Sequence, residues 1–515
     1  MELLAYLVNV FQASTFSLLM AGLVAGIVLG ATPGLSSTFA LAVMLPVTLA
    51  MGQLNALVFL GAVLMGSTYG GAFASILLNT PGTPQSVTTT FDGFPMAKRG
   101  DGDLALTIAC LVSAFGGFAG VLAFVILAPP LAHIALQFGP PEMFWLALFG
   151  LTIIGSLSRG NLLKGLISGA IGLAISMMGI AIVSADARFT FGLPGLAGGV
   201  HIIPATVGLL CLPVLFDMLG DADHHLSSSV TTVRIRFRES LKAISSRASN
   251  LCQSTVAGTL IGILPGAGGA IASIVAYSFA KKQSVPKSGE LAFGEGNPGG
   301  IIASESANNA TVGGGLVPTL VLGIPGSPPD AVILAAMLIH GLQIGPSLFT
   351  NHGDIVYSFS AGMLIASVLL IPVGLLLGRL ICHFVMRVTK TLLIPLIAFM
   401  TIVGAYSIRN NYYDVVMMMV IGVLGWILSR LGFPTAPIVL GFLLGPIAEQ
   451  GFSQAYMIGS ARNDVIGTFL GSGISIGLVT VILFILLMPL VKAGLISRKG
   501  LLEANDLSKT SGSSQ

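Results

Sequence analysis

The chain has 515 residues, of which 54% are hydrophobic and only 8% are charged, and its net charge is +3. A soluble domain carries about 25% charged residues, so this composition excludes a soluble globular protein. It also excludes intrinsic disorder, which requires low hydrophobicity and a high net charge, and the near balance of charge argues against nucleic-acid binding. We therefore expect an all-α polytopic membrane protein.

Segments without Asp, Glu, Lys or Arg occur along the whole chain, at residues 3–91, 104–141, 189–216, 331–353, 355–378, 391–408 and 465–491. A spanning helix needs about 20 apolar residues, so the first segment must hold several. With weakly charged segments added, the sequence predicts roughly 10–14 helical membrane segments. A membrane β-barrel is excluded, because it would show alternating segments of about ten residues.

The first segment contains two Pro-Gly pairs, at Pro33–Gly34 and Pro81–Gly82, and similar surroundings return at Pro265–Gly266 and Pro325–Gly326. The motifs of the first half return in the same order in the second, at nearly constant offsets of 232 and 244 residues, which indicates an internal duplication. The spacing widens slightly in the second half, which predicts an inserted solvated loop at residues 281–290.

The duplication divides the chain into five parts. These are a first transmembrane repeat at 1–220, a basic amphipathic connector at 221–250, a second repeat at 251–450, an extra C-terminal membrane helix at 451–491 and a polar tail at 492–515. Basic segments beside a bilayer usually face the cytoplasm, so the connector and the tail should share one side. The chain from the connector to the tail passes through one repeat and the extra helix, so both can lie on one side only if each repeat crosses the membrane an odd number of times. Two such repeats are inverted relative to each other, as in secondary transporters.

The Pro-Gly pairs also predict a binding site. Proline removes a backbone hydrogen bond and glycine permits a sharp turn, and within a membrane such breaks occur only where protein or a water-filled cavity surrounds them. Four symmetric breaks predict one central cavity, whose helix N-termini suit a carboxylate. The predicted substrate-binding residues are Ser36, Ser37, Thr80, Gly82, Thr83, Gly266, Gly326 and Ser327, and the predicted helix breaks are Pro33, Gly34, Pro81, Pro265 and Pro325. The alternative is that these pairs form ordinary kinks or turns outside the membrane.

A second group of polar residues is predicted to bind an ion. Glu305 lies three and four residues before Asn308 and Asn309, so the three side chains share one face of a helix. An acidic side chain in an apolar region is costly and is usually functional, although Glu305 could also be a solvated residue at a helix start. Asn79, beside the second break, completes the ion-binding candidates, and a helix-cap or loop role is at least as plausible for Asp92 and Asp330.

Motifs for catalysis and for metal binding are absent from the sequence. Its four cysteines are far apart in apolar surroundings and are interpreted as small buried hydrophobes, its seven histidines are scattered, and no ATP-binding loop is present. We expect no enzyme activity, no metal site and no cofactor, and an intramembrane enzyme would need facing catalytic residues such as two Asp.

Long motifs in both halves resemble one membrane-protein family. The segments are 66–84, 92–100, 293–296, 305–309, 322–327 and 339–346. They are similar to the large membrane subunit of the tripartite tricarboxylate transporters, the TctA family, over about residues 15–450.

The resemblance implies a permease of the bacterial inner membrane. It implies a small four-helix membrane subunit and a periplasmic solute-binding protein as partners, and a carboxylate such as citrate as the substrate. It also implies uptake by symport with a cation, Na⁺ or H⁺, rather than by ATP hydrolysis. The alternative function is an ion channel or a membrane scaffold that transports nothing.

Overall fold

The computed structural model describes residues 2–32, 35–81, 83–157, 162–181, 186–220, 234–283, 291–383, 390–407 and 409–487. Three residues of the predicted breaks, Pro33, Gly34 and Gly82, lie outside these ranges, as do residues 221–233 of the predicted connector and residues 488–515 at the C-terminus.

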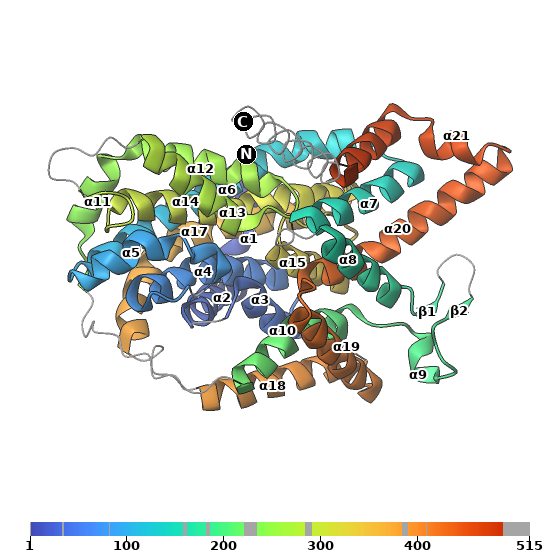
Figure 1. The fold of residues 1–515 in the computed structure, drawn as a ribbon, viewed down its shortest axis with the longest axis horizontal. Helices are drawn as coiled ribbons and strands as arrows, with labels where there is room; N and C mark the ends of the chain where they lie inside the picture. Colours follow the sequence, from blue (N-terminus) through green and yellow to red (C-terminus); the bar gives the residue numbers. More distant parts are fainter. Residues whose placement is uncertain are drawn as a thin grey trace, which may run out of the picture.

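The all-α prediction is confirmed, because nearly all regular structure in the described residues is helical (Figure 1). The first half contains α1 (Glu2–Val10), α2 (Ala13–Ala31), α3 (Ser37–Met44), η1 (Leu45–Ala50), α4 (Gln53–Leu78), η2 (Pro84–Ser86), α5 (Thr89–Lys98), α6 (Gly102–Ala135), α7 (Pro140–Leu157), α8 (Leu162–Ser176), α9 (Pro194–Ala197) and α10 (Ile202–Gly220). Two short antiparallel strands, β1 (Gly179–Ile180) and β2 (Ala187–Arg188), precede α9.

The remaining helices begin near the end of the predicted connector. They are α11 (Phe237–Ser245), α12 (Ala248–Ile263), α13 (Gly268–Gln283), α14 (Pro298–Leu322), α15 (Pro328–Ile339), α16 (Ser347–Asn351), α17 (Gly353–His383), α18 (Lys390–Ser407), α19 (Tyr412–Arg430), α20 (Thr435–Ala461) and α21 (Val465–Leu470), followed by a helix at Gly473–Leu487. The prediction of a loop from residue 281 is wrong for residues 281–283, which form the last turn of α13, and residues 284–290 lie outside the described ranges.

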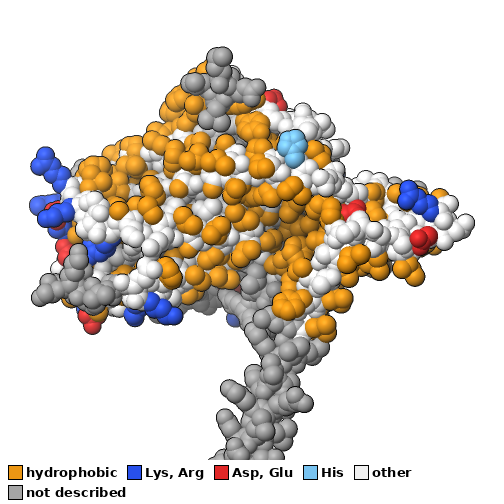
Figure 2. Space-filling view, turned by 90° about the horizontal axis from the view of Figure 1, so that it is seen from above, with side chains coloured by type: hydrophobic (Ala, Val, Ile, Leu, Met, Phe, Trp, Pro, Cys, Tyr) orange, Lys and Arg blue, Asp and Glu red, His pale blue; other side chains and the backbone are white. Residues whose placement is uncertain are grey.

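Seven described helices are long and apolar enough to cross a membrane, and five shorter apolar helices accompany them. Together they fall within the predicted number of membrane segments. Figure 2 shows hydrophobic side chains across most of one face, whereas Lys and Arg gather at its left edge, the end where Figure 1 places α5 and α11. This distribution is typical of a polytopic membrane protein.

The most deeply buried helix is α14, in which every residue from Gly299 to Val321 is buried. Its neighbours are α6, α12 and α13, with smaller contacts to α4 and α5. Length and hydropathy alone do not mark α14 as a span, because its sequence contains Glu305, several hydroxyl residues and two asparagines. Its polar side chains therefore need partners from other helices or from a bound solute, ion or water.

Each half of the chain contains a matching pair of closely packed helices. In the first half, Gly26 and Gly30 of α2 lie directly against the backbone of α4, and in the second half Gly258 and Gly262 of α12 lie directly against α14. Glycine permits this close approach because a Cβ atom at any of these positions would overlap the neighbouring helix. The shared arrangement supports the internal duplication, while the inverted orientation of the halves stays a prediction.

The two halves also exchange helices. α6 of the first half packs on α14, and α17 of the second half packs on α4. The same exchange joins α8 with α20 and α10 with α19. Neither half therefore encloses its own core, and each half covers the central helix of the other.

Cysteine burial differs from the prediction at one position. Cys110 and Cys211 are buried as expected, but Cys252 is exposed on α12. The expectation of a buried small hydrophobe is therefore wrong for Cys252 in this single chain, because the face of α12 that carries it turns away from α14. The side chain of Cys382 lies outside the described set.

The contact between α6 and α14 can be tested at Gly120, where a Cβ atom would overlap the carbonyl oxygen of Ala310. We expect Gly120→Ala to lower the unfolding temperature of the purified protein, because overpacking costs about 1–3 kcal/mol. Gly477→Ala is the matched control, since a Cβ atom there meets no atom within 4 Å. Equal unfolding temperatures for the two variants would contradict this packing.

Candidate functional site

The two predicted breaks of the second half lie against each other. The backbone N–H of Gly266 donates to the carbonyl oxygen of Gly326 at 2.8 Å, and the N–H of Gly326 donates to the hydroxyl of Thr319 at 3.2 Å. Pro265, Pro325 and Gly326 are buried. These contacts place the start of α13 beside the start of α15, so two helix N-termini meet inside the protein.

The residues that follow the second break of the first half pack against the start of α13 as well. η2 packs against α13 and α14, and a Cβ atom on Gly269 would lie 2.9 Å from Cγ of Gln85 and 2.5 Å from Oδ1 of Asn308. Thr83 and Ser86 form a capping box at η2, and the hydroxyl of Ser75 donates to the hydroxyl of Ser86 at 2.9 Å. Three of the four predicted breaks therefore converge next to the polar face of α14.

At the first break, the structure describes only the residues on either side of Pro33 and Gly34. The hydroxyl of Ser36 accepts the N–H of Phe39 at 3.1 Å and so caps α3. Ser37 is fully buried, and α3 packs against α15, the helix that begins just after the fourth break. Contacts of α3 thus extend the cluster to the residues next to Pro33 and Gly34, which themselves lie outside the described residues.

Glu305 is buried at the centre of this polar face. Its carboxylate accepts hydrogen bonds from Thr89 of α5 and, at 3.2 Å, from Ser113 of α6. The hydroxyl of Thr89 also lies 3.1 Å from that of Ser304. The interpretation of Glu305 as a solvated helix-start residue is therefore wrong, because the side chain is fully buried within α14.

Polar atoms without a partner concentrate in the same region. Among the described residues, ten buried side-chain atoms have no hydrogen-bond partner, and seven of them belong to Ser37, Thr80, Gln85, Thr88, Ser306, Asn308 and Asn309. A buried polar group without a partner is costly, so such a group calls for an explanation in a ligand, an ion or water. Four of these seven residues are predicted site residues, namely Ser37, Thr80, Asn308 and Asn309.

The other predicted residues have different surroundings. The hydroxyl of Ser327 donates to Asp330 at 2.6 Å, which makes Asp330 a buried partner in the first turn of α15. Thr83 is buried in its capping box, whereas Asn79 and Pro81 are exposed. Asn79 adopts a left-handed conformation with φ 56° and ends α4, just as Gly323 with φ 71° ends α14.

Several functional candidates could not be singled out from the sequence. Gln85, Thr88, Thr89 and Ser113 reach the polar face of α14 only through the packing of η2, α5 and α6. Their only sequence signal is that the first three follow directly after the Pro-Gly pair at residues 81–82.

Asp92 joins the two halves of the chain. One carboxylate oxygen accepts the N–H groups of Gly294, Gly296 and Asn297 at 2.7–2.9 Å, and the other accepts the hydroxyl of Tyr277 at 2.9 Å. Asp92 is therefore neither a helix cap nor a loop residue, since it lies on α5 and is fully buried.

Buried positive charge is missing from the site. Among the residues that the structure describes, no Lys, Arg or His is buried, whereas Asp92, Glu305 and Asp330 are. An anion at the breaks would therefore depend on hydroxyl groups, amides and N–H groups at a helix N-terminus. Within the described ranges, no three or more His, Cys, Asp or Glu side chains form a group that could hold a metal ion.

These features define a class of protein: a polytopic α-helical membrane protein with a buried polar site where interrupted helices meet, as in secondary transporters. Sequence comparison identifies the family within this class. The chain belongs to the tripartite tricarboxylate transporter TctA family, which it matches over residues 16–440. It is a membrane component of a transporter of this kind.

Two Agrobacterium vitis proteins are similar to the chain. One, described as an uncharacterized 52.8 kDa protein in the TAR-I ttuC′ 3′ region, is 34% identical over 475 residues, covering 92% of this chain and 93% of its own length. The other, described as an uncharacterized protein in the TAR-II ttuC′ 3′ region, is 37% identical over 231 residues, which are 44% of this chain and 94% of its own. No solved structure shows significant similarity.

The role of Asp92 predicts the behaviour of the loop that it holds. We expect Asp92→Ala to raise amide hydrogen exchange over residues 291–297 by at least roughly tenfold, because three backbone N–H groups lose their acceptor. Asp354→Ala is the control, since Asp354 is an exposed residue in the first turn of α17. Exchange that is equally slow in both variants would show that Asp92 does not hold the loop.

Proposed function

We propose that the chain is the permease subunit of a secondary-active importer that takes up a di- or tricarboxylate such as citrate. A periplasmic solute-binding protein delivers the substrate, and a small four-helix membrane subunit completes the complex in the bacterial inner membrane. The observation that carries this proposal is the concentration of unpartnered buried hydroxyl and amide groups where the helix breaks meet, in a chain of the tripartite tricarboxylate transporter family.

The chemistry of the break cluster supports a carboxylate as the substrate. Hydroxyl groups such as those of Ser37 and Thr80 have a proton to donate and no acceptor among the described residues. α13 begins beside the break cluster, and the first N–H groups of a helix attract anions. α15 also begins there, but its first two residues, Pro328 and Pro329, have no N–H to offer. A carboxylate satisfies both sets of donors without a buried Lys or Arg.

The acidic residues support coupling to a cation. A carboxylate substrate beside Glu305 would be repelled unless a positive charge lay between them. The oxygens of Glu305, Thr89 and Ser304 converge on one place, and the unpartnered Oδ1 atoms of Asn308 and Asn309 lie three and four residues along the same helix. We assign this group of oxygens to the co-transported Na⁺ or H⁺, so that cation and substrate enter together.

Uptake into proteoliposomes tests the proposal. The chain is reconstituted with its small membrane subunit, radiolabelled citrate and the cognate binding protein are added outside, and Na⁺ and pH gradients are imposed separately. We expect saturable accumulation that requires the binding protein and one of the two gradients. Glu305→Gln should lower gradient-driven accumulation by roughly tenfold or more, because the cation loses its charged ligand, while citrate exchange without a gradient persists.

The matched control is Glu239→Gln, which removes an exposed carboxylate that pairs with Arg236 on α11 and should leave uptake unchanged. Citrate flux that neither saturates nor needs the binding protein would identify a channel instead. Accumulation by Glu305→Gln at the level of the unmodified protein would refute the coupling role of Glu305.

A further inference from the structure

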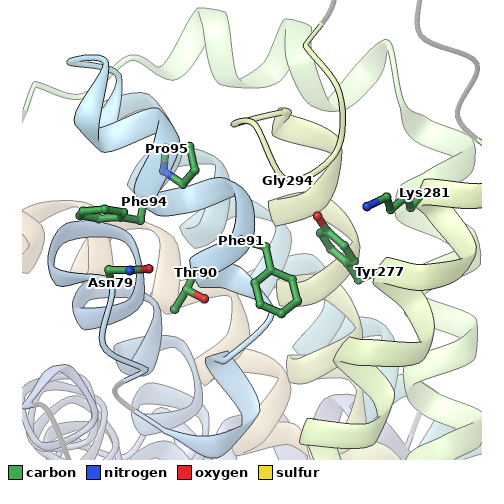
Figure 3. Close-up of a pocket in the computed structure, with 8 residues that line it drawn as sticks. All are labelled: Asn79, Thr90, Phe91, Phe94, Pro95, Tyr277, Lys281 and Gly294. Carbon is green, nitrogen blue, oxygen red and sulfur yellow. The ribbon is translucent and has the colours of Figure 1, made fainter.

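A cavity of about 460 Å³ opens between α5 and α13, at the end of the molecule where the basic residues gather (Figure 3). It is lined by Asn79, Thr90, Phe91, Phe94, Pro95, Tyr277, Lys281 and Gly294. Its volume lies within the range of about 300–1,000 Å³ that is usual for small-molecule sites. Helices of both halves form it, since Asn79 and α5 belong to the first half and α13 to the second.

Among the residues that the structure describes, Lys281 is the only cationic one that lines this cavity. It lies in the last turn of α13 and is exposed, and it forms no ion pair with any residue that the structure describes. Figure 3 shows its ammonium group directed toward the side of the cavity formed by Tyr277 and Gly294. Its charge is therefore available to an anion that enters the cavity.

The nearest buried acid does not compete for this charge. The two oxygens of Asp92 already accept three backbone N–H groups and the Tyr277 hydroxyl. Hydrogen bonds from these donors already stabilise the charged carboxylate, so an ion pair with Lys281 would add little. Asp92 therefore fixes the position of Tyr277 and forms no ion pair with Lys281.

The remaining walls suit the body of a small organic acid. The rings of Phe91 and Tyr277 meet edge to face with centroids 5.4 Å apart and form an apolar surface. Thr90 and Asn79 add a hydroxyl and an amide on the opposite side of the cavity from Lys281 (Figure 3). Apolar walls with a few directed polar groups are typical of binding sites for small molecules.

The start of α5 lies between the cavity and the central site. Thr90 lines the cavity, the adjacent Thr89 donates to Glu305, and the hydroxyl of Thr88 is buried without a partner. Asn79 likewise lies only two residues before Pro81 at the second break. A solute in the cavity is therefore next to the chain segment that forms one wall of the central site.

We propose that this cavity is a carboxylate-binding vestibule at the cytoplasmic mouth of the transport path, with Lys281 contacting the substrate carboxylate. The inference rests on the proposed function, because it takes the same substrate class and the same pathway. The cytoplasmic side follows from the surrounding basic residues, among them Lys98, Arg99 and Lys282, under the positive-inside rule. The vestibule receives the substrate when it leaves the central site and retains it briefly by charge.

Citrate exchange measured from the cytoplasmic face tests the vestibule. In inside-out vesicles that contain the complex, Lys281→Gln should raise the citrate concentration that gives half-maximal exchange by roughly three- to tenfold, because a charge-assisted contact is lost. Lys281→Arg should retain the value of the unmodified protein. Lys282→Gln is the matched control, since Lys282 is the neighbouring exposed lysine and does not line the cavity.

A second measurement does not depend on transport. Lysine acetylation by a water-soluble reagent, followed by mass spectrometry, should show that citrate protects Lys281 and leaves Lys282 reactive, whereas glucose at the same concentration protects neither. Equal protection of both lysines, or equal half-maximal concentrations for Lys281→Gln and Lys282→Gln, would overturn the vestibule while leaving the proposed function intact. A complete lack of citrate exchange by the unmodified complex would overturn both.

Discussion

The structure depends on the burial of a polar helix. α14 has no exposed residue between Gly299 and Val321, yet it carries a carboxylate, two amides and several hydroxyl groups. Within a membrane these groups have no bulk water as a partner, so the surrounding helices, a bound solute or an enclosed water must supply their hydrogen bonds. The glycines of α6 and α12 bring those helices against the backbone of α14, and Thr89 and Ser113 then reach Glu305.

The exchange of helices between the halves follows from the same requirement. Helices of the second half do not enclose α14 by themselves, and α6 of the first half covers the remaining side. In the same way, α17 of the second half packs on α4 of the first. A site enclosed in this way contains residues of both halves. Relative movement of the halves would therefore change the site itself, which is a suitable arrangement for alternating access.

The sequence predicts the fold class and the clustering of the Pro-Gly segments better than it predicts the individual contacts. Charge scarcity and the repeated Pro-Gly pairs indicate a helical membrane protein with a central polar cluster, and Ser37, Thr80, Asn308 and Asn309 indeed have unpartnered buried atoms. A search for charge-free segments passes over α14, because Glu305 interrupts it, although α14 is the most buried helix. The roles of Asp92 and Lys281 depend on contacts between α5 and the second half, which spacing along one chain does not reveal.

The central claim is that the helix breaks bind the carboxylate beside the polar face of α14, and protection of a cysteine at position 37 tests it most directly. In a background without native cysteines, Ser37→Cys is treated with a small thiol reagent in membranes, with and without citrate. The account predicts that citrate slows modification at position 37 but not at Ser168→Cys, a similarly buried and unpartnered serine on α8. Modification of Ser37→Cys at the same rate with and without citrate would contradict the account.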